Sequence, residues 1–243
     1  MLTECGLVNA VSTRHGGVSA APFDTLNLSH MVGDTPENVN ENHARLMRAL
    51  GMNRDDLVQA SQAQADDWAR VDSSRRGTRI KDVDALMTNE RGLPMLLRFA
   101  DCVPIMLVDP GHHAAAIVHS GWRGTTLRIL EKTIRGMQGE FGTRAQAVRA
   151  FIGPAIGPCC YSVGDDVIAR VRAEYTDADA LLTVHDGHTH FDLWAANERQ
   201  LRDAGVEHIE TAGLCTSNRT DDFYSWRAER ATTGRFAAVV SLL

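Results

Sequence analysis

Cys102 and His119 are the residues whose types and positions point most directly to chemistry. Cys102 separates two apolar segments in LLRFADCVPIMLVDP, and His119 ends an apolar run before a glycine-rich turn in AAAIVHSGWRG. A buried polar atom without a partner costs about 1–3 kcal/mol, so stability alone gives little reason to place either group there. A thiol and an imidazole at the ends of two buried strands therefore predict a functional site.

The chemistry of Cys102 and His119 depends on which third group lies beside them. Thiolate and neutral imidazole are preferred ligands of zinc and copper, but a third ligand is needed. A catalytic metal also keeps an open position for a water, whose pKa falls from about 15.7 to about 7. A structural buried cysteine and a core histidine would also explain each residue taken separately.

The turn that follows His119 is a candidate anion site. It runs Ser120-Gly121-Trp122-Arg123-Gly124 and joins a buried strand to a helix N-terminus, where unpaired backbone N–H groups favour negative charge. Arg123 adds a guanidinium able to bind phosphate with two hydrogen bonds. The alternative is that Gly121 and Gly124 only permit a tight turn. Three other loops, residues 12–19, 153–158 and 223–227, have compositions typical either of ligand-binding loops or of simple strand reversals.

Helices and strands can be expected around these residues. Thr35 and Pro36 are typical of a helix start, and Gly51 of its end. Shorter helices are expected at 165–175 and 194–204. A helix after the HSGWRG turn, ended by Gly142, is predicted by apolar residues at spacings of three and four, namely Leu127, Leu130, Ile134, Met137 and Phe141.

Many of the predicted strands are apolar at successive positions and are therefore expected to be buried on both faces. They lie at residues 93–99, 103–108, 114–119, 148–152 and 235–242. Strands and helices do not alternate strictly, which favours an α+β fold of mixed β-sheets flanked by helices. No linker or repeat divides the sequence, so we expect a single domain over residues 1–243.

Composition excludes several classes of protein. The chain has 243 residues, 44% of them hydrophobic and 23% charged, as in an ordinary soluble globular protein. A net charge of −6, with 25 basic residues among 31 acidic ones, argues against nucleic acid but leaves room for a small anion. The absence of a signal sequence and of a run of about 20 apolar residues predicts a cytoplasmic protein without a membrane partner. Five cysteines, two of them adjacent at Cys159 and Cys160, make a disulfide framework unexpected.

Read in order, the motifs resemble the purine nucleoside phosphorylase family, also known as laccase-domain or multicopper polyphenol oxidoreductase proteins. The resemblance covers nearly the whole chain. It is carried by STRHGGVS, FDTLNLSHMVGD, ADCVP, HSGWRG, IGPAIGPCCYSVG, FDLWAANERQL, CTS at 215–217 and FYSWRAERATTGRFAAVVSL.

The resemblance implies a fold, an activity and a set of partners. The fold would be similar to that of the cytotoxic-necrotizing-factor-like Cys–His hydrolases. The activity would be phosphorolysis of adenosine, inosine or methylthioadenosine, with adenosine deamination as a companion reaction. The partners would be a purine nucleoside and phosphate, bound by a monomer or a homodimer.

The resemblance also implies a metal held by His, Cys and His, of which Cys102 and His119 match the second and third ligands. The first belongs to a Gln-x-His-Gly run, and here Gln62-Ala63-Gln64-Ala65 places Gln64 at that position. An amide oxygen is a poorer ligand than imidazole, so we expect zinc binding to be weakened. Copper is less expected, because a laccase needs many closely spaced histidines. Asp66, Asp67, His112 and His113 are the substitutes considered.

The expected reaction needs an anion site and a group that handles protons, and the remaining residues are candidates for these roles. Arg14, Arg123, Gly121 and Gly124 are expected to bind phosphate, and Asp101 either orients a ligand, moves a proton or is structural. Two other classes stay open. Gln64 could serve as an amide donor in a metal-free Cys–His hydrolase or amidase. Its presence is also consistent with a degenerate relative that binds without turnover.

Overall fold

The computed structural model describes residues 5–243, so the first four residues of the expected domain lie outside the described part. Its α-helices are α1 (Pro36–Ala49), α2 (Trp122–Thr126), α3 (Ile129–Phe141), α4 (Asp165–Glu174) and α5 (Leu193–Asp203). Within residues 5–243, no helix combines the length and the apolar character needed to cross a bilayer.

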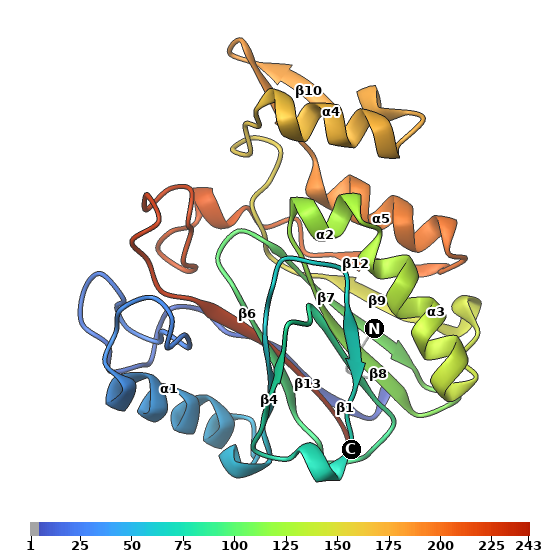
Figure 1. Ribbon diagram of the computed structural model, residues 1–243. Helices are drawn as coiled ribbons and strands as arrows, with labels where there is room; N and C mark the ends of the chain where they lie inside the picture. Colours follow the sequence, from blue (N-terminus) through green and yellow to red (C-terminus); the bar gives the residue numbers. More distant parts are fainter. Residues whose placement is uncertain (1–4) are drawn as a thin grey trace.

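Two large sheets and one hairpin contain the strands (Figure 1). The five-stranded sheet has the order β1 (Leu7–Val11), β13 (Phe236–Leu242), β6 (Met95–Phe99), β2 (Val58–Ser61) and β4 (Arg79–Lys81). The six-stranded sheet has the order β12 (His208–Thr211), β9 (Arg149–Ile152), β7 (Val103–Asp109), β8 (Ala114–Ser120), β5 (Ala85–Thr88) and β3 (Trp68–Arg70). The hairpin is formed by β10 (Leu182–His185) and β11 (His188–Phe191). Both large sheets mix parallel and antiparallel pairs, which confirms the predicted α+β class.

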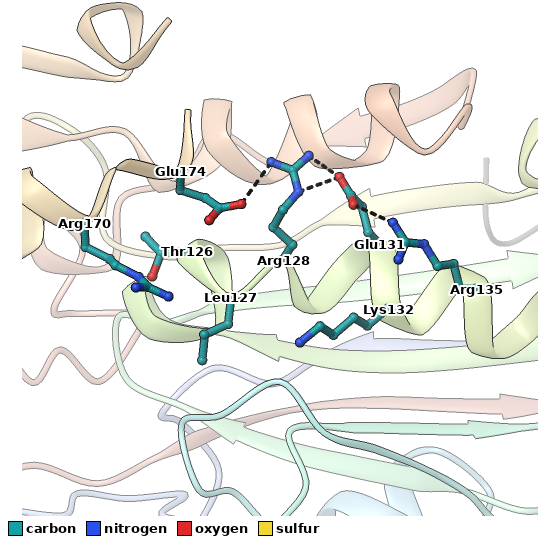
Figure 2. Close-up of a pocket in the computed structure, with 8 residues that line it drawn as sticks. All are labelled: Thr126, Leu127, Arg128, Glu131, Lys132, Arg135, Arg170 and Glu174. Atoms are coloured by element: carbon teal, nitrogen blue, oxygen red, sulfur yellow. Dashed lines mark hydrogen bonds and ion pairs between the residues drawn. The ribbon is translucent and has the colours of Figure 1, made fainter. Parts of the chain in front are cut away.

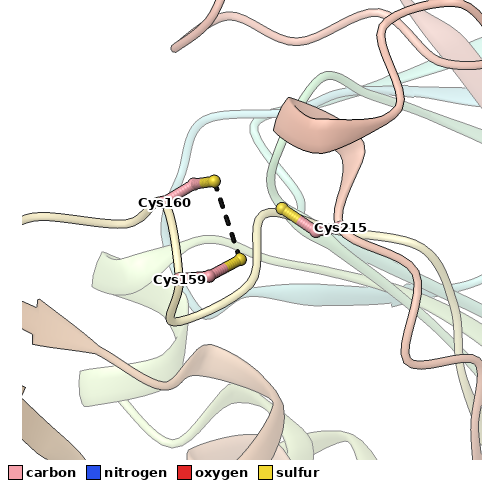
Figure 3. Close-up of side chains that lie close together, drawn as sticks. All are labelled: Cys159, Cys160 and Cys215. Atoms are coloured by element: carbon pink, nitrogen blue, oxygen red, sulfur yellow. Dashed lines mark hydrogen bonds between the residues drawn. The ribbon is translucent and has the colours of Figure 1, made fainter.

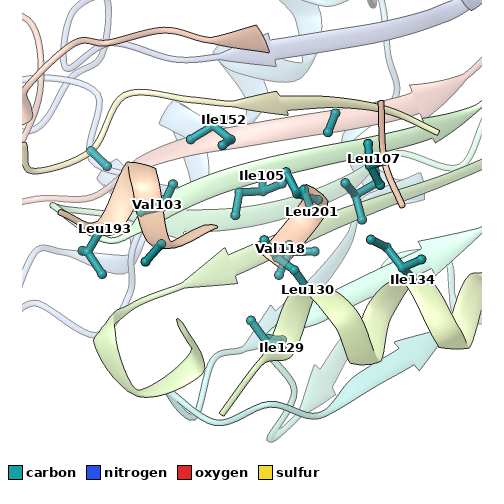
Figure 4. Close-up of a cluster of buried hydrophobic side chains, with 14 of the residues drawn as sticks. Val103, Ile105, Leu107, Val118, Ile129, Leu130, Ile134, Ile152, Leu193 and Leu201 are labelled. Atoms are coloured by element: carbon teal, nitrogen blue, oxygen red, sulfur yellow. The ribbon is translucent and has the colours of Figure 1, made fainter. Parts of the chain in front are cut away.

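The two large sheets pack face to face, with helices on their outer faces. Leu97 and Phe236 of the five-stranded sheet share one buried cluster with Met106 and Ile117 of the six-stranded sheet. On the outer face of the first sheet, α1 buries its own apolar side chains against Leu96 and neighbouring residues. On the outer face of the second sheet, α3 and α5 cover side chains of β7, β8 and β9 (Figure 4). This burial on both faces agrees with the unbroken apolar runs of the central strands.

The helix predicted after the HSGWRG turn is interrupted. Arg128 has a φ of 60°, in the left-handed region, and divides the segment into α2 and α3. The prediction of one continuous helix from the turn to Gly142 is therefore wrong, because a left-handed residue cannot continue an α-helix. The predicted end is confirmed, since Gly142 caps α3 with a φ of 71°. The start of α1 is also confirmed, because the Thr35 side chain accepts a hydrogen bond from Asn38 N.

Candidate functional site

The β7–β8 hairpin brings Cys102 and His119 together. Cys102 immediately precedes β7, and the antiparallel register pairs the next residue, Val103, with Ser120, and Pro104 with His119. The two side chains are close enough for Cys102 to raise the pKa of His119. Gly121 lies against the thiol, since a Cβ at this position would stand 3.0 Å from Cys102 Sγ. Gly121 therefore lets the backbone approach the sulfur closely, and a larger residue there would push against the thiol.

Asp84 completes this pair and was not foreseen from the sequence. Its Oδ1 lies 2.7 Å from His119 Nδ1, and its backbone oxygen accepts a hydrogen bond from His119 N at 2.8 Å. The Asp84 side chain is completely buried. With Nδ1 bound to the carboxylate, Nε2 is the ring nitrogen that remains for Cys102. Asp84, His119 and Cys102 therefore stand in the order of a catalytic triad.

The charges of this triad depend on one another. Burial alone lowers the pKa of His119, but the negative charge of Cys102 and the hydrogen bond and charge of Asp84 outweigh it and raise the pKa to about 10. Burial raises the pKa of Asp84, but the hydrogen bond and charge of His119 outweigh it and lower that pKa. At neutral pH the pair is therefore an imidazolium bound to a carboxylate, which gives His119 a proton to donate.

Gln64 is tied to the same carboxylate. Asp84 Oδ2 accepts hydrogen bonds from Ala63 N at 3.0 Å and from Ala65 N at 2.9 Å, the residues on either side of Gln64. Gln64 itself has a φ of 57° and an exposed side chain. Its Oε1 accepts a hydrogen bond from Arg123 Nη1 at 3.4 Å. The segment that carries Gln64 is thus held beside His119, with the amide turned to Arg123.

These donors do not fit a three-ligand metal centre. Gln64 directs its oxygen to Arg123, and among residues 5–243 only Cys159, Cys160 and Cys215 form a sufficiently close group of three His, Cys, Asp or Glu side chains. Three of the four expected substitutes have other partners: Asp66 pairs with Lys132, and His113 pairs with Arg91. His112 binds Asp109 at the far end of β7, about 20 Å of strand away from Cys102. Cys102 and His119 supply two of the expected ligands.

Asp101 joins three loops next to Cys102. Its Oδ1 accepts a hydrogen bond from Thr216 Oγ1 at 2.7 Å, and its Oδ2 accepts one from Arg227 N at 2.6 Å. Its backbone oxygen accepts a hydrogen bond from Ile156 N at 2.9 Å. Burial raises the pKa of Asp101, and its φ of 82° is in the left-handed region. This strained backbone and these three contacts fix the position from which the Cys102 side chain projects.

The two expected phosphate-binding arginines differ in their surroundings. Arg14 is buried, and its guanidinium donates to Asp24 O at 2.9 Å, Thr220 O at 2.7 Å and Glu229 Oε1 at 3.0 Å. Arg123 is exposed and lies 4.9 Å from the Trp122 ring centre, with Gln64 as its hydrogen-bond partner. Arg123 is therefore the arginine whose guanidinium is accessible to an anion.

Aromatic and basic side chains complete the surroundings of Cys102. The rings of Phe99 and His119 are 5.4 Å apart. Burial raises the pKa of Tyr161, and the nearby charge of Cys102 adds to this effect. Arg235 lies close enough for the charge of Cys102 to act on its pKa, although burial has the larger effect and lowers it. Tyr161 belongs to the CCYSVG motif, so the sequence could have suggested it as a site residue. No sequence feature of Arg235 suggests that it lies near Cys102.

Surface hollows extend along α2 and α3 beside the site. One of about 230 Å³ is lined by Arg128, Lys132 and Arg170 among others (Figure 2). Arg128 forms ion pairs with Glu131 and Glu174 there, so its charge is already compensated. A neighbouring hollow of about 300 Å³ is lined by Trp122, Arg123 and Arg170 among others. This second hollow connects the exposed Arg123 to an accessible surface.

Comparison with known proteins gives matches over almost the whole chain. Residues 8–243 match the family model described as multi-copper polyphenol oxidoreductase laccase. The purine nucleoside phosphorylase YlmD of Geobacillus stearothermophilus is 37% identical, over 97% of this chain and 90% of that protein. The purine nucleoside phosphorylase of Deinococcus radiodurans is 36% identical, over 96% and 88%. The crystal structure of the Geobacillus YlmD has a TM-score of 0.94 at 36% identity, with 98% of this chain and 92% of that one covered.

Proposed function

This chain belongs to the multi-copper polyphenol oxidoreductase laccase family, whose curated relatives here are named purine nucleoside phosphorylases, and we propose that it is itself a purine nucleoside phosphorylase. The observation that carries the proposal is the placement of His119 between Asp84 and Cys102, with Arg123 on the adjoining turn. The proposed substrates are phosphate and adenosine, inosine or methylthioadenosine.

In phosphorolysis, a phosphate oxygen forms a bond to the sugar C1′ while the bond from C1′ to the purine nitrogen breaks. The products are the free base and the sugar 1-phosphate, and the departing base must take up a proton. His119 is suited to donate this proton, because Asp84 and Cys102 keep its imidazole protonated at neutral pH. Asp84 holds the ring in one orientation and stabilises its charge.

The phosphate is proposed to bind at the turn after β8. Arg123 supplies a charged donor, and the backbone N–H groups of Gly121 and Gly124 belong to the uncapped first turn of α2. Arg14 and Asp101 are assigned as positioning residues in place of the direct roles first expected. Asp101 contacts Thr216 and Arg227 and so holds the backbone beside Cys102. Arg14 joins its own loop to the loops that carry Thr220 and Glu229.

Adenosine deamination replaces an amino group with an oxygen from water, and it therefore needs an activated water. Zinc, when bound, supplies such activation by lowering the pKa of the water. Cys102 and His119 supply only two donors, and Gln64, at the position of the third ligand, directs its amide oxygen to Arg123, so these residues do not fit such a metal. We therefore propose that deamination is weaker than phosphorolysis in this chain, and that copper-dependent phenol oxidation is absent.

The direct test is incubation of the purified protein with adenosine and phosphate, followed by chromatography. Adenine and ribose 1-phosphate are expected in equal amounts, and they should disappear when phosphate is omitted or Cys102 is replaced in Cys102→Ala. Inosine and hypoxanthine would report deamination. Lack of turnover of every proposed nucleoside, with and without added zinc, would contradict the proposal.

A metal-free cysteine hydrolase or amidase is the second candidate, favoured by the Asp84–His119–Cys102 order and by Gln64 in place of a histidine. In that reaction the Cys102 thiolate attacks an amide carbonyl, His119 protonates the departing amine, and water then hydrolyses the thioester. Amide cleavage that survives strong chelators and is lost on alkylation of Cys102 would support this candidate.

Gln64→His separates these functions from that of a degenerate binding protein. A gain in bound zinc and in deamination indicates a metal enzyme that has lost one ligand. Unchanged amide cleavage in the variant indicates the metal-free hydrolase. Nucleoside binding without turnover, in both the natural chain and the variant, indicates the degenerate relative.

A further inference from the structure

Cys159, Cys160 and Cys215 form a cluster of thiols outside the site described above (Figure 3). Cys159 and Cys160 lie in the loop between β9 and α4, and Cys215 follows β12. The two loops are joined by a parallel bridge between Ala155 and Cys215. The three sulfur atoms lie within 4.8 Å of one another, and Cys159 Sγ and Cys160 Sγ are 3.6 Å apart.

A small rearrangement would bring these three sulfur atoms to the separations found around a single cation. A metal–sulfur distance of about 2.3 Å places two coordinating sulfurs about 3.8–4.0 Å apart, for tetrahedral or trigonal geometry. A disulfide instead requires about 2.05 Å, so Cys159 and Cys160 are not bonded to each other. Three cysteines from two hydrogen-bonded loops are thus close to coordinating distance as free thiols.

Two of the groups around the cluster donate hydrogen bonds to its sulfurs. Gly157 N donates to Cys215 Sγ at 3.2 Å, and Asn218 Nδ2 donates to Cys159 Sγ at 3.3 Å. Such N–H donors around ligating sulfurs orient them and stabilise their charge. Cys160 Sγ itself donates to Asn218 Oδ1 at 3.0 Å, and it must give up this proton when it binds a cation. Gly157 is tightly enclosed, because a Cβ there would stand 2.8 Å from the Trp194 ring. The absence of a side chain lets its backbone N–H come within hydrogen-bonding distance of Cys215 Sγ. Cys159 is exposed and provides a path for an ion to enter.

We propose that Cys159, Cys160 and Cys215 bind a thiophilic cation, with Cu(I) preferred over Zn²⁺. Soft thiolate ligands select Cu(I), and three of them complete its trigonal coordination. Structural zinc almost always takes four ligands, and the described residues bring no fourth His, Cys, Asp or Glu into this group. The proposal is independent of the proposed function, because it concerns binding away from Cys102 and is measured without turnover.

The test uses the full-length chain in the Cys102→Ala background, which removes the other candidate ligand pair. The reduced protein competes anaerobically with bicinchoninate for Cu(I), and in a second series with a chromophoric chelator for Zn²⁺. One tightly held equivalent of Cu(I) is expected. It should be lost on adding Cys215→Ser and kept on adding Cys5→Ser, the matched control.

Mass spectrometry after alkylation locates the ion, since Cu(I) should protect Cys159 and Cys160 from modification. Thermal melts establish that each variant is folded, and Cys159→Ser, at the exposed position, replaces Cys215→Ser if the buried substitution unfolds the chain. Failure of the Cys102→Ala protein to hold Cu(I), or retention of Cu(I) after loss of a cluster cysteine, would overturn the proposal. Tighter retention of Zn²⁺ would overturn the assignment of Cu(I).

Discussion

Asp84 is the residue on which the chemistry of His119 depends. It binds the imidazole with one carboxylate oxygen and the backbone around Gln64 with the other. The amide of Asp84→Asn has nearly the same shape but no charge, so His119 should lose much of its preference for a proton. We expect kcat to fall about 100-fold or more, because general acid catalysis contributes on that order.

The measurement is the pH profile of phosphorolysis by Asp84→Asn. Its alkaline limb should move to lower pH, since the raised pKa of His119 depends in part on Asp84. Asp67→Asn, which changes an exposed aspartate of the neighbouring segment, is the matched control and should leave the profile in place. An unchanged profile in Asp84→Asn would contradict the triad assignment.

Arg123 is expected to bind phosphate and not the nucleoside. Hydrogen bonds to charged groups contribute about 1.5–3 kcal/mol, so Arg123→Ala should raise the KM for phosphate about 10-fold to 100-fold. The KM for the nucleoside should change little. Arg135→Ala removes a surface arginine from α3 and serves as the control. Steady-state kinetics with each substrate varied in turn gives the comparison, and equal changes in both constants would count against this role.

At the residue scale, the sequence predicted the pairing of thiol and imidazole but not the partner of the imidazole. Cys102 and His119 stand out because each polar side chain borders an apolar run. Asp84 lies in KDVDALMT, where nothing in the local pattern separates a buried carboxylate from one in a turn. Arg14 shows that residue type alone can also suggest a role too readily. An arginine suits phosphate, but the guanidinium of Arg14 binds Asp24 and Glu229 of the protein itself.

At the scale of elements, α3 allows a matched pair of substitutions. A Cβ at Gly136 would stand 2.7 Å from the Trp68 ring and 2.9 Å from Met87 Cε, whereas a Cβ at Gly139 meets nothing within 4 Å. Gly139→Ala should stabilise the protein by about 1 kcal/mol through helix propensity. Gly136→Ala gains the same term but overpacks the contact with β3 and β5, which costs about 1–3 kcal/mol.

Urea denaturation of both variants measures these changes in the free energy of unfolding. Both substitutions replace glycine by alanine, about one turn apart in the same helix. The contribution of helix propensity therefore cancels when the two changes in the free energy of unfolding are subtracted. A stabilised Gly136→Ala protein would show that Trp68 and Met87 move aside at little cost, contrary to close packing of α3 on the sheet.

The elements that could be predicted from the sequence were those with a long run of apolar residues or a clear helix cap. The central strands β6, β7, β8 and β13 follow from their apolar runs, and α1 follows from its cap. Strands β2, β3 and β4 have only three or four residues, too few to display a period. Their positions depend on parallel pairing with distant strands, which sequence pattern alone does not encode.

At the scale of the whole molecule, two buried histidines make stability depend on pH with opposite signs. Burial lowers the pKa of His43 to about 3, so its contribution is present above the ordinary value of 6.5 and is lost as the pH falls below it. The pKa of His119 is raised to about 10, so its contribution is present below 6.5 and is lost as the pH rises through 10.

The expected result is a stability maximum close to pH 6.5, measured by urea denaturation between pH 4 and pH 10. His43→Gln should flatten the acid side of the profile, and His119→Gln should flatten the alkaline side. Each variant is thus the control for the other. A profile whose alkaline side is the same with and without His119 would show that this residue does not hold its extra proton in the folded protein.

The antiparallel pairing of β7 with β8 has a consequence for how the protein is assembled. Cys102 and His119 are 17 positions apart and meet through one short turn, so they can approach each other early, at small entropic cost of loop closure. Asp84 and the Gln64 segment join through a neighbouring strand and a long excursion of the chain. We expect the thiol and the imidazole to meet before Asp84 joins them, and Cys102 to be more open to oxidants and electrophiles in this partly assembled state than in the folded protein.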